Sequence, residues 1–170
     1  VFVGQASLIQ SFRLPFAVFP LQSLANNLVT FLHGLVVHVL LMLLLKGSFA
    51  TLPVLFVSLV AVSAILYPAV SVLAILGARF RDLAPLIGSA MYMAFLVTPI
   101  IWERATIGAE MRWIVDFNPL YHMIEVLRRP MLGTMPSRAS TLVTLGLAVV
   151  ATAGGELFFR RYARPIPFWV

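Results

Sequence analysis

The sequence predicts an all-α integral membrane protein with four membrane-crossing helices and one helical hairpin outside the membrane. Hydrophobic residues make up 61% of the 170 positions, and only 11% are charged. The mean hydropathy is +1.01. Soluble domains are roughly 45–50% apolar and about 25% charged. This chain has too few polar groups to cover a globular surface, so a soluble domain is excluded.

Long stretches without charge predict where the chain crosses the membrane. Asp, Glu, Lys and Arg are absent from residues 14–45, 47–78, 83–102 and 139–155. A helix needs about 20 mostly apolar residues to cross roughly 30 Å of hydrocarbon. The stretches are continuously apolar rather than alternating, which favours helices over barrel strands. We expect crossings at 22–45, 52–77, 83–102 and 140–158.

The 103–139 segment holds half of the charges and a further predicted helix. Asn118 suits the N-cap, Pro119 suits the first helical position, and Pro130 with Gly133 ends the pattern. Four apolar residues at helical spacing predict its buried face: Leu120, Met123, Ile124 and Leu127. At about 12 residues the helix is too short to cross. A shorter piece over 108–117 is expected to pair with it as a hairpin.

The charged residues of this segment predict ion pairs rather than catalysis. Glu125 and Arg129 are four residues apart in the favourable order. Glu103, Asp116 and Glu125 all lie near bases, so a structural role is favoured over an acid–base set. His122 and Glu125 share a helical turn, but two ligands do not make a zinc site.

Several classes of function lack their signatures. The sequence has no G-x-x-x-x-G-K-[ST] loop, no G-x-S-x-G, no H-E-x-x-H and no cysteine. We therefore expect no nucleotide, metal or other cofactor on this chain. The twelve basic residues form no stripe, which argues against nucleic acid as a partner. Two small-x-x-x-small pairs, Ala90 with Ala94 and Ala148 with Thr152, suit close helix contact.

The distribution of positive charges is used to predict the orientation of the chain in the membrane. Four crossings place six Lys or Arg residues on each side, so the count is a tie. The bases at 1–20, 77–83 and 159–170 are packed into short turns and a tail, which favours cytoplasmic ends and an external 103–139 loop. The first 20 residues lack a Met start and a basic region and carry Pro15 and Pro20, unlike a signal peptide. We expect an N-terminally truncated chain.

Five segments in the same order carry a resemblance to a known family. They are Arg13-Leu14-Pro15 with Pro20, the turn Gly77-Ala78-Arg79-Phe80-Arg81-Asp82-Leu83, residues 95–102 (FLVTPIIW), residues 117–122 (FNPLYH) and residues 164–169 (RPIPFW). Together they resemble ABC-2 type permeases that export polysaccharides such as O-antigen, capsule and teichoic acid. The resemblance implies the type V-like exporter fold, with the first two of about six helices missing here.

The resemblance also implies partners and residue roles. Two permease copies would form a pore in the inner membrane, and two separate ATP-binding subunits would carry ATP and Mg. The coupling contacts to these subunits would be Arg13, Leu14, Pro15, Arg79, Arg81 and Asp82. The external gate would involve Asn118, Pro119, Tyr121, His122 and Glu125. Tyr92 and Trp102 are candidate channel residues for a lipid-linked glycan, because aromatic rings stack on sugars.

Other functions fit the same composition. A membrane-embedded structural or assembly subunit that transports nothing would show similar helices and turns. An ABC-2 exporter of drugs or small lipids would share the fold. A membrane enzyme is disfavoured, since no nucleophile–base or metal constellation is present.

Overall fold

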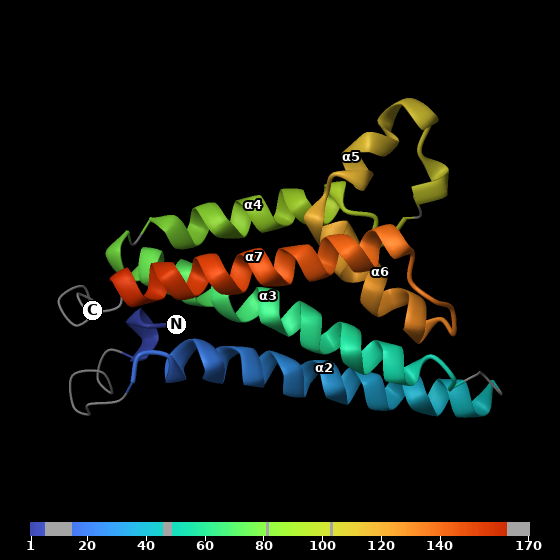
Figure 1. Ribbon diagram of the computed structural model, residues 1–170, viewed down its shortest axis with the longest axis horizontal. Helices are drawn as coiled ribbons and strands as arrows, with labels where there is room; N and C mark the ends of the chain where they lie inside the picture. Colours follow the sequence, from blue (N-terminus) through green and yellow to red (C-terminus); the bar gives the residue numbers. More distant parts are fainter. Residues whose placement is uncertain (6–14, 46–48, 81, 103, 163–170) are drawn as a thin grey trace. The chain divides into compact units, whose positions relative to one another are not determined.

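The computed structural model describes residues 1–170 except 6–14, 46–48, 81, 103 and 163–170, and the described part of the chain contains helices and no strands (Figure 1). In chain order the elements are the 3-10 helix η1 (Val3–Gln5), α2 (Val18–Leu44), α3 (Leu52–Arg79), α4 (Leu83–Val97), the 3-10 helices η2 (Arg104–Thr106) and η3 (Ala109–Met111), α5 (Arg112–Asp116), α6 (Pro119–Met131) and α7 (Arg138–Tyr162).

Three helices, α2, α3 and α7, are long and apolar enough to cross a membrane. They contain 27, 28 and 25 residues, or roughly 38–42 Å at 1.5 Å per residue. The protein is therefore a helical membrane protein. Helix α2 begins at Val18, four residues earlier than predicted. Pro20 lies within its first turn, where the missing proline N–H has no helical partner to lose.

Helix α4 is shorter than predicted. We expected a crossing over 83–102, but the helix ends at Val97 after 15 residues, or about 22 Å. Thr98 is followed by Pro99, whose ring disfavours the helical conformation of the preceding residue. The charge-free gap up to Trp102 therefore overstates the helix, since residues 98–102 continue as bends.

The described residues group into two compact units. The first contains residues 1–47, 63–84 and 148–170, and the second contains residues 48–62 and 85–147. Helices α3, α4 and α7 each contribute residues to both.

In the first unit, α3 and α7 meet at a proline inside α3. Pro68 has no N–H, so the carbonyl of Ala64, four residues earlier, loses its helical donor. The Thr152 hydroxyl of α7 donates to that carbonyl at 3.1 Å. Gly155, one turn further along α7, faces the Pro68 ring. The expected close contact at Thr152 is confirmed, and its partner is a backbone carbonyl.

Within the same unit, a mainly aromatic cluster joins Phe2 to the start of α2, to α3 and to the end of α7. Buried Phe2 packs edge-on against Phe19, with ring centroids 5.9 Å apart. The cluster also contains Ala74, Ile75 and Ala78 of α3, and Phe16, Phe158, Phe159 and Tyr162 pack against it. The aromatic residues near the end of α7 are therefore packing residues of this unit.

Gly155→Ala should weaken the contact between α3 and α7. An added Cβ would overlap the Cβ of Pro68 and lie 3.2 Å from its Cα. Overpacking of this kind costs about 1–3 kcal/mol. Gly154→Ala is the matched control, because a methyl group added at Gly154 would meet nothing within 4 Å. Unfolding in detergent micelles should show a loss for Gly155→Ala alone, and equal stability of the two variants would refute this close contact.

Candidate functional site

Helix α6 has well-defined ends that its sequence specifies. The Asn118 Oδ1 accepts the Leu120 N–H at 3.0 Å, and Pro119 follows at the first helical position. At the other end Gly133 has φ +74°. The Gly133 N–H donates to the Pro130 carbonyl and the Thr134 N–H to the Arg129 carbonyl, at 3.1 and 3.0 Å. These two bonds form a Schellman motif. Both predicted ends are confirmed, with Pro130 lying inside the last turn.

The buried face of α6 differs from the predicted one. The buried residues are His122, Met123, Glu125, Val126 and Pro130. Of the four apolar residues expected to be buried, Met123 is correct, whereas Leu120, Ile124 and Leu127 are only half-buried. Apolar periodicity missed this face because polar groups anchor it, and the partners of His122 and of the Pro130 carbonyl include side chains from other segments of the chain.

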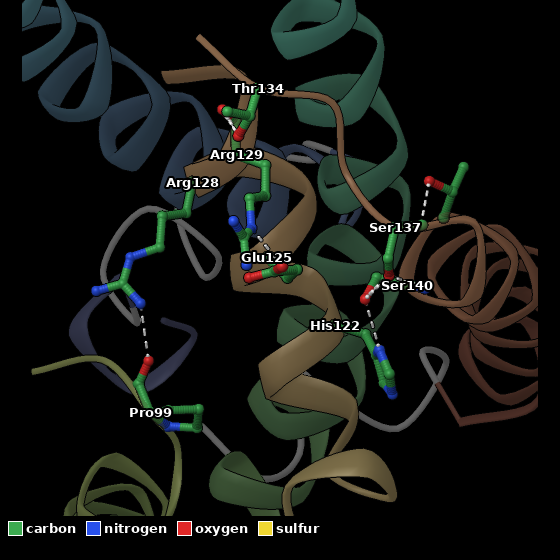
Figure 2. Close-up of polar contacts among 9 residues, drawn as sticks. Pro99, His122, Glu125, Arg128, Arg129, Thr134, Ser137 and Ser140 are labelled. Atoms are coloured by element: carbon green, nitrogen blue, oxygen red, sulfur yellow. Dashed lines mark hydrogen bonds and ion pairs between the residues drawn. The ribbon is translucent and has the colours of Figure 1, made fainter. Parts of the chain in front are cut away.

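On one side, α6 is tied to the chain that follows α4. The Asn118 Nδ2 donates to the buried Thr98 hydroxyl at 2.8 Å. The Arg128 guanidinium donates to the carbonyls of Pro99 and Ile100 at 3.1 and 2.6 Å. Figure 2 shows Arg128 reaching from α6 toward Pro99. These carbonyls lie just beyond the end of α4, so Arg128 supplies donors that a continued helix would have provided.

On a different side, His122 connects α6 to α5 and to the start of α7, and Figure 2 shows its contact with Ser140. Its Nε2 lies 2.8 Å from the Asp116 carbonyl, and its Nδ1 lies 3.0 Å from the Ser140 hydroxyl. A carbonyl only accepts, so Nε2 carries a proton and donates to Asp116. Ser137 donates to Ser140 and caps α7 by accepting the Ser140 N–H at 3.1 Å. Both ring nitrogens of His122 are thus engaged.

A fourth contact joins α6 to the residue before α3. The buried Thr51 hydroxyl donates to the Pro130 carbonyl at 2.7 Å. All these partners belong to the second unit. The hairpin is therefore fixed by side-chain contacts to three other segments of that unit.

Two acidic residues of the hairpin, Asp116 and Glu125, form ion pairs, as expected. Arg104 Nε and Nη2 each donate to Asp116 at 2.7 Å. This hydrogen bonding lowers the pKa of Asp116 and raises the pKa of Arg104. Arg129 pairs with the buried Glu125 at 2.7 Å. Glu103 lies outside the described residues.

An open pocket of about 340 Å³ lies beside these pairs. Its polar lining consists of Arg104, Arg112, Tyr121, Glu125, Arg128 and Arg129. Burial raises the pKa of Tyr121, so its phenol stays neutral at physiological pH. Among the described residues no group of three or more His, Cys, Asp or Glu side chains could hold a metal ion. Four of its six polar lining residues are arginines, so the pocket is basic.

The remaining predicted site residues are scattered. Arg13, Leu14 and Arg81 lie outside the described residues. Pro15 precedes α2, and Asp82 lies between α3 and α4. Arg79 is the last residue of α3, and its guanidinium lies 5.4 Å from the Phe80 ring centroid. On α4, Tyr92 is 67% exposed. Trp102 donates to the Leu96 carbonyl at 3.3 Å.

Sequence reasoning missed the residues that fix the hairpin. Thr98, Arg128, Ser137 and Ser140 were not singled out, although Ser137-x-x-Ser140 before an apolar run is a detectable helix start. The bond from Arg128 to two backbone carbonyls has no sequence signal.

Comparison of the chain with protein-family models, curated proteins and solved structures finds no match. The case for any function therefore rests on the residues and geometry described above.

Asn118→Ala should destabilise the hairpin by about 2 kcal/mol, because it removes an N-cap worth about 1 kcal/mol and a bond to a buried hydroxyl of similar value. Asn118→Ser is the matched control: its hydroxyl can cap α6 but is too short to reach Thr98. We expect roughly half the loss for serine, measured by unfolding in micelles. Equal losses for both variants would mean that the Thr98 contact contributes nothing.

Proposed function

We propose that the protein is the transmembrane permease subunit of an ATP-driven exporter that moves a lipid-linked polysaccharide across the inner membrane. The observation that carries the proposal is the α5–α6 hairpin. It is a short helical element between two apolar helices, too short at 13 residues to cross, and anchored to the chain after α4 and to the start of α7. An anchored helix of this kind suits a gate at the outer mouth of a pore.

The proposal assigns the chemistry of ATP to other chains. This sequence carries no P-loop. Two copies of the permease would form the pore, and two ATP-binding subunits would hydrolyse ATP with Mg on the cytoplasmic side. The contacts with the ATP-binding subunits would be made by the segment Arg13–Pro15 and by Arg79, Arg81 and Asp82.

Within the proposed gate the residues have different tasks. Asn118 and Pro119 set the start of α6, and His122 and Glu125 are buried in polar contacts that hold the helix. Tyr121 lines the pocket and is only half-buried. It is therefore an aromatic gate residue with a surface left for a passing glycan. Tyr92 and Trp102 remain candidates for sugar stacking on the membrane side.

Reversing the charges at Arg79 and Arg81 tests the proposed coupling. In the full-length protein co-purified with its ATP-binding subunit, Arg79→Glu/Arg81→Glu should lower stimulated ATPase activity and export about tenfold or more, because like charges would repel the complementary surface. Arg161→Glu, a basic residue at the end of α7, is the control and should keep both activities. Normal ATPase activity and export in a correctly inserted double variant would contradict the proposal and favour an assembly subunit.

Breaking α6 tests the proposed gate. Ile124→Pro places proline in the middle of the helix, at a cost of about 3 kcal/mol or more. We expect loss of export or an ion leak across proteoliposomes, with dimer formation retained. Pro119→Ala should change little, since many residues serve at the first helical position. If export and leak stay at wild-type levels after circular dichroism shows the helix is lost, α6 is only a surface anchor.

A further inference from the structure

The pocket beside α6 carries more positive charge than its surroundings neutralise. Four arginines and one glutamate line it, so its formal charge is +4 − 1 = +3. Asp116, which pairs with Arg104, lowers the sum to +2. An excess of this size in a confined pocket attracts an anion.

Arg128 and Arg112 account for the excess. Among the described residues, the Arg128 guanidinium donates only to the carbonyls of Pro99 and Ile100, which are neutral. No described carboxylate lies within ion-pair distance of Arg128 or Arg112; the pocket's two other arginines pair with Asp116 and Glu125. Removing a guanidinium partly from water costs free energy when it has hydrogen bonds but no ion pair. A bound anion would offset that cost.

The donors of the pocket are held in place before any ligand arrives. Two backbone carbonyls fix the Arg128 guanidinium, and Asp116 fixes Arg104 through two parallel bonds. Each guanidinium has five N–H donors, so both keep donors for a further acceptor. Tyr121 adds a neutral hydroxyl. Preorganised donors lose little entropy on binding.

We propose that this pocket binds a phosphate group. A phosphate monoester carries about −1.5 to −2 charges at neutral pH and offers three acceptor oxygens, which match the residual charge of +2 and several guanidinium groups. A carboxylate carries a single charge and would leave the pocket positive. The volume of about 340 Å³ is at the small end of ligand sites, and suits a headgroup rather than a sugar chain.

The phosphate can come from two sources, a lipid headgroup or a free phosphate compound. The pocket lies in a segment flanked by the apolar helices α4 and α7, so both the membrane surface and solution supply candidates. The proposal does not rest on the exporter function. Its test uses the purified permease without an ATP-binding subunit.

Isothermal titration calorimetry on the full-length protein in detergent micelles distinguishes the sources. One arm uses inorganic pyrophosphate, and a second uses short-chain phosphatidic acid with the matching phosphatidylcholine as the neutral control. Chloride keeps the ionic strength constant, because exposed charges are screened by salt. Binding in the lipid arm alone identifies a headgroup site, and binding in both arms identifies a site for phosphate from either source.

Two pocket variants and one matched control locate the site. Arg128→Gln and Arg112→Gln should each weaken binding about tenfold, the loss of one charge-assisted contact. The Arg112 side chain has no hydrogen-bond partner among the described residues, so Arg112→Gln leaves the fold intact even if Arg128→Gln disturbs it. Arg138→Gln, at the exposed start of α7 and outside the pocket, should bind like the wild type.

The proposal fails in either of two ways. Absence of binding to both pyrophosphate and phosphatidic acid would overturn it. Equal weakening by Arg138→Gln and by the pocket variants would also overturn it, because the attraction would then come from the net charge of the loop.

Discussion

Side-chain donors that reach backbone carbonyls at prolines and helix ends hold the described segments of each unit together. In hydrocarbon an unpaired carbonyl costs several kcal/mol, so each needs a donor from elsewhere in the protein. Thr152 reaches the Ala64 carbonyl that Pro68 leaves without a donor. In the second unit, Arg128 reaches the carbonyls of Pro99 and Ile100 just beyond the end of α4. Thr51 adds a donor to the Pro130 carbonyl, which also accepts the Gly133 N–H. In each case a side chain from another segment donates to a carbonyl at a proline or just beyond the end of a helix.

This constraint explains why a short helix can be held firmly. Helix α6 is amphipathic and buries two polar residues, His122 and Glu125, that would be costly without partners. Each of its side-chain contacts contributes only about 0.5–1.5 kcal/mol. Because they reach the chain after α4, the start of α7 and the start of α3, together they fix the hairpin in three directions. A movement of α6 must break several of them at once.

The same contacts leave a charge imbalance on one side of the helix. Arg128 binds neutral carbonyls to hold the chain after α4, so its positive charge is not cancelled there. Arg129 and Arg104 form ion pairs, so they add hydrogen-bond donors to the pocket but little net charge. The structural role of Arg128 and the basic character of the pocket are thus consequences of one arrangement. An anion bound there would also stabilise the hairpin, since it would interact with residues of α5, α6 and the chain between α4 and α5.

The sequence by itself determined the membrane class, the positions of the long helices and both ends of α6, because these depend on local composition and on the caps at Asn118 and Gly133. The Glu125–Arg129 pair was predictable for the same reason, since i, i+4 neighbours are fixed by helix geometry. The true end of α4, the buried face of α6 and the partners of His122 and Arg128 were decided by tertiary structure. Those features depend on which carbonyl or hydroxyl of another segment lies next to a given side chain. Helical periodicity carries no information about contacts between segments.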